Sequence, residues 1–336
     1  IDVLLSKNNN PFINLEYVAN PISFIPNKKF LLNKSLSVRQ YDDAVVLPIK
    51  PHNNNPYFMG GVLDKDGKYI QTTSLEDRIT YNDYPVTGTI PYVDEEVIYI
   101  GCFWKHYGHF ILELVSYLWY AMKNADSGLR FCYSTVDNGS LPSYMLEFLS
   151  LLGIKEEKLL QVKTPTRFKK IWIPEHSVSS SLFYTNEYKM IYDRITENIT
   201  PIPNDKTYLS RTHFGKAKET EFGEEYIEKL FAKNGFKIIY PEELSFSEQI
   251  AIIRGARTVA CVSGTLMHQM MFAESGANLI VINKTPTVNR TQWIINELKN
   301  LYVTYIDAYI SLPYVVLGRG PFLLVDSDLL HKFIKD

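Results

Sequence analysis

The sequence predicts an α/β protein with parallel sheets, because strand-like and helix-like segments alternate along most of its 336 residues. The clearest alternation runs from Tyr208 to Asn283, and a second one runs from Glu96 to Glu175. Between them, the segment TPIPND at residues 200–205 has the composition of a linker. These observations favour two Rossmann-like domains that face one another across a cleft.

The composition is that of a globular protein without a charge bias. Hydrophobic residues make up 46% of the chain and charged residues 21%, which suits a sizeable core. Lys+Arg number 35 against 37 for Asp+Glu, and this balance argues against a general nucleic-acid binder. The longest apolar run is too short to span a bilayer, so we expect peripheral membrane association at most. The three cysteines lack metal-ligand spacing and are expected to be free, buried thiols.

The first half of the chain predicts an irregular lead-in followed by an α/β unit. Residues 1 to about 60 are rich in Asn and Pro, with short strand-like pieces such as Ala44 to Pro48. The unit then reads, in order, as strand VIYIG, helix HYGHFILELVSYLWYAMKN, strand LRFCYST, helix LPSYMLEFLSLLG, and strands LLQVK and FKKIWIPE. A helix from about Asn186 to Asn198 precedes the linker. We predict an N-terminal Rossmann-like domain with an irregular lead-in over residues 1–200.

The second half predicts a more regular parallel sheet. It reads as strand YLSR, basic loop THFGKAKE, a helix, strand KIIYPEEL, helix SFSEQIAIIRGA, strand TVACVSG, helix TLMHQMMFAESG and strand ANLIVIN. The helix TQWIINELKNLY, the strand VTYIDAY and a helical segment from Ser327 to Ile334 follow. We predict a second Rossmann-like domain over residues 201–310, and a segment over 311–336 that packs back on the N-terminal domain.

A basic loop follows the strand YLSR, at the edge where parallel sheets bind ligands. Arg211 ends this strand, and its planar guanidinium suits bidentate contact with phosphate. Lys216 supplies a point charge in the same loop, together with His213 and Lys218. A solvated basic loop is the alternative interpretation, and we expect Lys218 to be solvated.

A second candidate for anion binding is the helix start at Ser263, Gly264 and Thr265. A glycine lets the backbone approach a ligand closely, and the helix directs free N–H groups and its positive dipole at that ligand. A plain N-cap is the alternative. With Arg211, these residues predict a site for a nucleotide diphosphate.

Two further residues lie near the ends of the same strands. Tyr240 ends the strand KIIY, where a nucleobase edge could meet backbone groups. Ser245-Phe246-Ser247-Glu248 fits a capping box, so we expect Ser245 to cap the next helix. Glu248 either completes this box or binds a ribose hydroxyl.

In the first half, His109 and Glu113 are four residues apart at the start of a helix, so their side chains share one face. This face follows a strand and is expected at the mouth of the cleft. A carboxylate there could take a proton from a hydroxyl nucleophile, with the imidazole orienting it. The alternative is a buried pair that stabilises the helix. No third ligand stands at a matching spacing, so we expect no metal site.

The order of these segments resembles the family 61 glycosyltransferases. The likeness covers roughly residues 97–283, through GHFILELV, YLSR with its basic loop, and the run from PEELSF to ANLIVI. It implies a GT-B fold and an inverting transfer from a nucleotide sugar, with a UDP-sugar favoured, to a hydroxyl of a glycan acceptor. It further implies that the domain over residues 1–200 binds the acceptor and that the domain over residues 201–310 binds the nucleotide sugar. It also implies that neither a metal nor another cofactor is obligatory.

The resemblance also assigns roles to single residues. Arg211 matches the arginine that holds the donor diphosphate, and His109 and Glu113 match a histidine and an acidic residue at the first helix. Glu248 and Gln249 match the Glu-Gln pair that follows PEELSF.

One motif departs from the family pattern, because Ser263-Gly264-Thr265 stands where His-Gly-Ala is usual. His268, one helical turn further on, is the candidate substitute for the missing histidine. The departure motivates an alternative function, a nucleotide- or carbohydrate-binding protein that has lost catalysis. A third possible function is that of a nucleotide-sugar epimerase or hydrolase. For the transferase we expect a bacterial or viral cytoplasmic enzyme of polysaccharide synthesis, or else the lumenal domain of a secretory-pathway enzyme.

Overall fold

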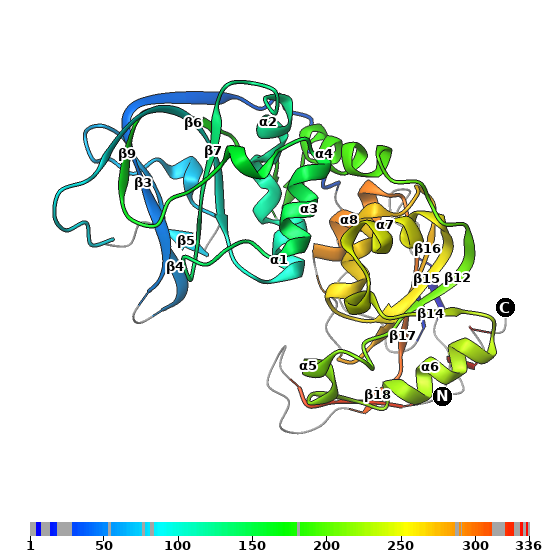
Figure 1. Cartoon of the computed structure of the whole chain (residues 1–336). Helices are drawn as coiled ribbons and strands as arrows, with labels where there is room; N and C mark the ends of the chain where they lie inside the picture. The colour runs from blue at the N-terminus through cyan, green and yellow to red at the C-terminus, as the bar shows by residue number, and fades with distance from the viewer. Residues whose placement is uncertain are drawn as a thin grey trace. The chain divides into compact units, whose positions relative to one another are not determined.

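The computed structural model describes residues 5–7, 14–18, 29–52, 55–75, 78–80, 84–179, 182–285, 289, 291–310, 320–325, 330–331 and 334. The chain forms two compact units (Figure 1). We call Leu31–Ile195 the N-terminal unit, and Ile1–Phe30 with Thr196–Asp336 the C-terminal unit. Both combine helices with sheets that contain parallel strands, so the predicted α/β class is confirmed. The arrangement of two facing domains stays a prediction.

The C-terminal unit is built on a seven-stranded sheet. Its strand order is β14-β12-β15-β16-β17-β2-β1, and every neighbouring pair is parallel except β1 with β2. The strands are β12 (Asn204–Leu209), β14 (Lys237–Ile239), β15 (Ala256–Val262), β16 (Asn278–Asn283), β17 (Tyr302–Asp307), β2 (Asn14–Val18) and β1 (Leu5–Lys7). Numbered along the chain from β12, the first five have the order 2-1-3-4-5 of a doubly wound sheet.

Helices cover both faces of this sheet (Figure 1). They are α6 (Glu224–Lys233) on one face, with α7 (Phe246–Gly255), the 3₁₀ helix η5 (Thr265–Phe272) and α8 (Thr291–Leu298) on the other. The basic loop holds the short helix α5 (Gly215–Lys218), and the 3₁₀ helix η4 (Pro241–Glu243) follows β14. Among the described residues the predicted strands and helices are present, with two differences. TLMHQMMF forms a 3₁₀ helix rather than an α-helix, and the strand predicted over KIIYPEEL ends at Ile239, before η4. Most of the helical segment predicted from Ser327 to Ile334 lies outside the described residues.

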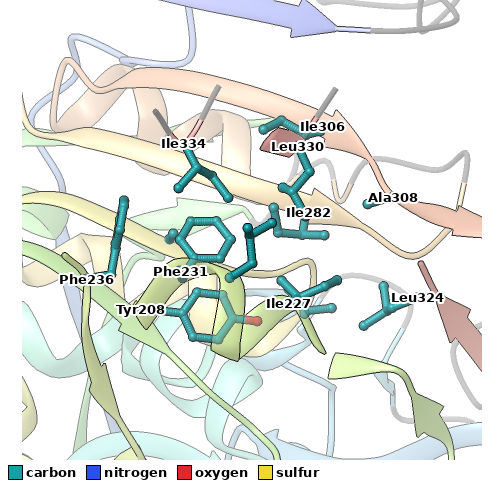
Figure 2. Packing of buried hydrophobic residues seen from close by; sticks show 13 residues of the cluster. Tyr208, Ile227, Phe231, Phe236, Ile282, Ile306, Ala308, Leu324, Leu330 and Ile334 are labelled. Atoms are coloured by element: carbon teal, nitrogen blue, oxygen red, sulfur yellow. The ribbon is translucent and has the colours of Figure 1, made fainter. Parts of the chain in front are cut away.

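The core under α6 includes residues from the end of the chain (Figure 2). Tyr208, Phe231 and Ile282 pack there with Leu330 and Ile334, all nearly fully buried. A small sheet extends this end of the unit, with the strands β13 (Glu221–Phe222), β19 (Phe322–Leu324) and β18 (Tyr309–Ile310). The described residues of the 311–336 segment thus pack on the C-terminal unit, whereas we expected them on the N-terminal domain.

The start of the chain also belongs to the C-terminal unit, whereas we expected it within a domain over residues 1–200. The reason is that β2 pairs in parallel with β17, with Tyr302 opposite Asn14 and Ile306 opposite Val18. Strand β17 would otherwise be an edge strand with unpaired backbone groups, and an added strand satisfies them.

The N-terminal unit contains a mixed seven-stranded sheet in the order β5-β4-β3-β9-β6-β7-β8. Strands β9, β6, β7 and β8 are parallel, but β3 is antiparallel to both β9 and β4, so only part of this sheet is Rossmann-like. The strands are β3 (Val38–His52), β4 (Asn55–Leu63), β5 (Ile79–Thr80), β6 (Tyr92–Phe103), β7 (Arg130–Thr135), β8 (Leu159–Gln161) and β9 (Thr166–Pro174). A separate pair, β10 (Val178–Ser179) and β11 (Phe183–Tyr184), is antiparallel.

The long helix predicted after β6 is interrupted at Glu113. Its pieces are α1 (Tyr107–Leu112), the 3₁₀ helix η2 (Leu114–Tyr117) and α2 (Leu118–Lys123). At the break, the Tyr188 hydroxyl donates to the Leu112 carbonyl at 2.9 Å, and the Tyr192 hydroxyl donates to the Ile111 carbonyl. Helix ends leave carbonyls without intrahelical partners, so these buried tyrosines stabilise the early end of α1.

Both tyrosines come from α4 (Asn186–Glu197). The other helices described in the N-terminal unit are α3 (Ser143–Leu151), η1 (Gln71–Thr73) and η3 (Glu156–Lys158). All three cysteines are buried and free, as expected. Within the described part of the chain, no helix combines the length and the apolar character needed to cross a bilayer.

Candidate functional site

The C-terminal sheet has a topological switch point between β12 and β15. The chain leaves β12 for β14 on one side and later returns to β15 on the other. Open α/β sheets bind ligands in the crevice at the carboxyl ends of such strands. Arg211 lies just beyond β12, Gly264 just beyond β15, and Lys284 directly after β16. The sheet therefore brings these three residues to the same edge.

The cationic side chains at this edge share one carboxylate. The Glu221 Oε1 atom lies 2.6 Å from Arg211 Nη1 and 2.6 Å from Lys284 Nζ. The Glu221 side chain is only 3% exposed. Burial lowers the pKa of Lys284, and the charge of Glu221 opposes that effect. We call Arg211, Lys284, Glu221 and Gly264 the cation cluster; the sequence analysis missed Lys284 and Glu221.

Gly264 forms a wall of this cluster. Its φ of 149° lies in the range that side chains rarely adopt. A Cβ atom at this position would lie 3.6 Å from Arg211 Nη1 and 3.7 Å from Lys284 Nζ. The bare backbone at residue 264 therefore gives a ligand close access to both cations. No side chain forms an N-cap hydrogen bond at the start of η5, so the turn does not support the alternative of a plain N-cap.

A second buried carboxylate holds the backbone under the cluster. Glu224 Oε1 accepts hydrogen bonds from the Tyr208 hydroxyl and from the Arg211 N–H, both at 3.1 Å. Burial raises the pKa of Glu224 to about 7, although these two donors and the Arg211 charge act against the shift. Glu224 therefore fixes where Arg211 leaves the sheet.

The other cations of the basic loop stay outside the cluster. Lys216 and Lys218 are exposed on α5. His213 instead stacks on Tyr240, with ring centroids 3.7 Å apart and planes 6° from parallel. Tyr240 also donates its hydroxyl to Glu228 at 3.1 Å. The stacked pair stands at the end of β14, one strand away from Arg211.

The capping box at the start of α7 is confirmed. Ser245 Oγ accepts from the Glu248 N–H at 3.3 Å, and Glu248 Oε2 accepts from the Ser245 N–H at 2.8 Å. Hydrogen bonds from Ser245 also lower the pKa of Glu248. Gln249 donates to the carbonyl oxygens of Pro241 and Leu244. These contacts give Glu248 and Gln249 structural roles.

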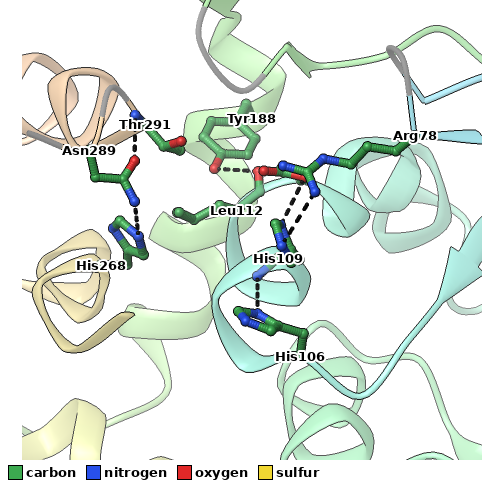
Figure 3. Close-up of polar contacts among 9 residues, drawn as sticks. Arg78, His106, His109, Leu112, Tyr188, His268, Asn289 and Thr291 are labelled. Carbon is green, nitrogen blue, oxygen red and sulfur yellow. Dashed lines mark hydrogen bonds and ion pairs between the residues drawn. The ribbon is translucent and has the colours of Figure 1, made fainter. Parts of the chain in front are cut away.

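His268, the candidate substitute for a phosphate-facing histidine, is 4% exposed. Its Nε2 lies 3.3 Å from Asn289 Nδ2 (Figure 3). Its Nδ1 lies 3.0 Å from Gln292 Oε1. The amide nitrogen of Asn289 is a donor, so Nε2 accepts and Nδ1–H donates. Both ring nitrogens are thus hydrogen-bonded to amide side chains, so a phosphate would have to displace one of these contacts to bind His268.

In the N-terminal unit, His109 and Glu113 form the contact that their spacing predicts. His109 Nδ1 lies 3.1 Å from a Glu113 oxygen, and Arg78 Nε lies 3.2 Å from the same oxygen. Arg78 Nη1 also lies 3.4 Å from His109 Nε2 (Figure 3). Arginine has only donors, so Nε2 accepts and Nδ1–H donates to Glu113. The sequence analysis missed Arg78.

The two members of this pair differ in exposure, with 26% of the His109 side chain and 8% of the Glu113 side chain exposed. His106 supports the pair from the start of α1, where its Nδ1 accepts the His109 N–H at 3.4 Å. Burial lowers the pKa of His106, and the neighbouring His109 adds to that effect. His109 is therefore the member of the pair that a substrate can reach.

No three His, Cys, Asp or Glu side chains within the described ranges come together in a way that could hold a metal ion. This finding concerns protein ligands only.

Comparison with known proteins identifies the chain. A family model described as Glycosyltransferase 61 matches residues 107–280, which is more than half of the chain. The matched region contains the His109–Glu113 pair, Arg211 and Gly264, and it ends just before Lys284. A search of curated proteins gave no match. The chain belongs to the glycosyltransferase 61 family and is a glycosyltransferase.

Proposed function

We propose that the enzyme transfers a sugar from a nucleotide diphosphate donor to a hydroxyl of a glycan acceptor, with inversion, in polysaccharide or surface-glycan synthesis. The cation cluster is the observation that carries this proposal. Two cations on one buried carboxylate leave positive charge at the switch point of a parallel sheet. A diphosphate supplies the matching negative charge and the acceptor oxygens. The family resemblance favours uridine as the nucleoside.

The same cluster would act on the leaving group. Negative charge builds on the departing diphosphate as the bond to the sugar breaks. Arg211 and Lys284 would offset this charge from fixed positions, which is the most effective form of electrostatic catalysis. The two side chains can thus fill the role that a divalent metal fills in other transferases, and we propose a metal-independent reaction.

For the acceptor hydroxyl, we propose His109 as the general base, with Glu113 orienting it. The sequence analysis assigned the proton transfer to Glu113, but the exposure of the two side chains favours the reverse. The carboxylate holds Nδ1–H and would stabilise the imidazolium as Nε2 accepts the proton. Arg78 is 41% exposed, so it can leave Nε2 to an incoming hydroxyl at little cost. A single displacement at the anomeric carbon then gives inversion.

The alternative is a binding protein of the same fold without catalysis. Ser263 stands where the resemblance leads us to expect a histidine, and both ring nitrogens of the buried His268 are hydrogen-bonded to amide side chains, which supports this alternative. Glu113→Gln separates the two functions. An enzyme would lose turnover and keep nucleotide binding, whereas a binding protein has no turnover to lose.

The decisive test is a thermal-shift measurement with UDP, GDP, CDP, ADP and CMP. A ligand that binds only the folded state adds about 2.7 kcal/mol of stability at a hundred times its Kd. We expect UDP to raise the Tm of the wild type and of Lys218→Ala, an exposed lysine of the same loop, but not that of Arg211→Ala. Two results would contradict the donor site. In the first, no nucleotide raises the Tm of the wild type; in the second, UDP raises the Tm of the wild type, Lys218→Ala and Arg211→Ala equally.

A further inference from the structure

A cavity of about 230 Å³ lies in the N-terminal unit, at the carboxyl ends of β6 and β7. Phe58 and Trp104 line it on one side, and Leu141 and Met145 contribute further apolar surface. Lys105 and Asp137 are its charged residues. Phe58, Trp104 and Lys105 lie outside the residues that match the family, so membership does not by itself imply this pocket.

The aromatic side of the cavity is a tilted pair of rings. The centroids of Phe58 and Trp104 are 5.4 Å apart and their planes meet at 33°. Aromatic faces carry partial negative charge, and they attract the slightly positive C–H groups on the face of a pyranose ring. This side of the cavity therefore suits a flat ligand with C–H groups on one face.

The charged residues suit hydroxyl groups. Lys105 Nζ lies 2.9 Å from Asp137 Oδ2, and both side chains are about half exposed. Asp137 also accepts the Gly139 N–H at 3.0 Å, which fixes its carboxylate in the turn after β7. An ammonium and a carboxylate side by side offer a donor and an acceptor, which is the pairing that neighbouring hydroxyls need.

The size of the cavity selects among ligands. Pockets for drug-sized molecules hold roughly 300–1,000 Å³, and this one is smaller. It fits a single sugar ring better than a nucleotide. The ligand also has little net charge to match, because the one cation of the pocket is already paired with its one anion.

The position of the cavity connects it with the proposed base. The Trp104 ring lies 5.7 Å from the His109 ring, centroid to centroid, and Trp104 lies three residues before the first residue of α1. A ring stacked on Trp104 would therefore lie close to the imidazole. We propose that this pocket binds the terminal pyranose ring of a neutral glycan acceptor, with the ring face on Trp104 and hydroxyls on Lys105 and Asp137. This inference rests on the proposed function.

The test uses the full chain and methyl pyranosides as probes. A panel of the glucoside, galactoside, mannoside, xyloside and N-acetylglucosaminide would be followed by saturation-transfer NMR. We expect at least one glycoside to bind the wild type, and Trp104→Ala to weaken that binding about tenfold, the equivalent of 1.4 kcal/mol. Asp137→Asn removes the charge but keeps the shape, and should weaken binding several-fold.

Two further variants control for the fold. Trp104→Phe keeps an aromatic face and should retain most of the binding, so a loss in Trp104→Ala alone points to stacking. Tyr92→Ala removes an exposed aromatic ring at the other end of β6 and should bind like the wild type. Binding of no glycoside, or equal binding by the wild type and Trp104→Ala, would overturn the assignment.

A UDP thermal shift on the same variants separates this inference from the proposed function. We expect the UDP shift to be the same in the wild type, Trp104→Ala and Asp137→Asn, because the donor residues are elsewhere. If UDP binds and no glycoside does, only the acceptor pocket is wrong. If a glycoside binds through Trp104 but no nucleotide binds, the pocket stands as a sugar site and the proposed donor site is wrong.

Discussion

The cation cluster and the His109–Glu113 pair each contain one buried carboxylate, but they differ in charge. Glu221 meets two cationic side chains, Arg211 and Lys284, so that group carries a net positive charge when both cations are protonated and Glu221 is ionised. Glu113 meets one guanidinium and one imidazole, so that group is neutral while the imidazole is neutral. The net positive charge of the cation cluster suits an anionic ligand. The neutral His109–Glu113 pair with Arg78 suits the transfer of a proton.

The two groups occupy equivalent places in their sheets. Arg211 follows β12, the first of the five strands in the 2-1-3-4-5 order, and the His109 helix follows β6, the first along the chain of the parallel strands β6 to β9. The strand end decides where a site lies, and the residues beyond it decide what the site does. The comparison makes four predictions, because a change in one group should alter its own function and spare that of the other.

The largest effect is expected from His109→Ala. Removal of a general base typically slows the chemical step by about 10²–10⁴-fold. UDP affinity should stay unchanged, because the cation cluster is intact. The measurement is UDP release in the presence of acceptor, with Glu113→Gln as the companion variant that keeps the imidazole but loses its charged partner. If UDP affinity in His109→Ala fell as much as the reaction rate, the two groups would not have separate functions.

Glu224→Gln tests the buried carboxyl beneath the cation cluster. The pKa of Glu224 is raised to about 7 in the folded protein, against an ordinary value of 4.5. Its contribution to stability is therefore present at low pH and is lost as pH rises through about 7. From about pH 5 to about pH 8, we expect the stability of the variant relative to wild type to rise by about 2 to 3 kcal/mol.

Urea denaturation of both proteins at several pH values measures this change. A stability difference that is independent of pH would show that Glu224 titrates alike in the folded and unfolded protein.

Lys284→Met tests whether the cluster needs both cations. A hydrogen bond to a charged group contributes roughly 1.5–3 kcal/mol, so UDP should bind about ten to a hundred times more weakly. Lys218→Met, on the exposed helix α5, is the matched control and should bind UDP like the wild type. Calorimetric titration gives both affinities, and equal values for the two variants would remove Lys284 from the donor site.

The smallest effect is expected from Glu248→Ala, which lies near the same sheet edge but in neither group. Loss of the capping box should lower the free energy of unfolding by about 1 kcal/mol. UDP affinity should not change. Thermal melting with and without UDP measures both quantities, and a weaker UDP affinity would restore the ribose-binding role for Glu248.

Local sequence patterns predicted the elements that depend on local chemistry. The alternation from Tyr208 to Asn283 gave the strands of the parallel sheet, and S-x-x-E gave the capping box of α7. The spacing of His109 and Glu113 gave their contact. Arg211 and Gly264 were found because a strand end next to a glycine or a cation is visible in the sequence.

The remaining features depend on partners that are distant in sequence. Glu221 and Lys284 meet only because β13 and the end of β16 come together. Strands β1 and β2 join the C-terminal unit through the pairing of β2 with β17. The break at Glu113 depends on tyrosines from α4, more than 70 residues later. The cavity at the ends of β6 and β7 joins Phe58 to Trp104 and Asp137, which no periodicity connects.

Glu221 has a consequence for the rate at which product leaves. A diphosphate held by Arg211 and Lys284 would compete with a carboxylate that already binds both side chains. When the product leaves, Glu221 can again form ion pairs with both cations, so neither cation is left as an unpaired buried charge. Exchange of one anion for another lowers the barrier to release. Glu221 would thus limit the affinity of the enzyme for its nucleotide product and so speed the release of that product.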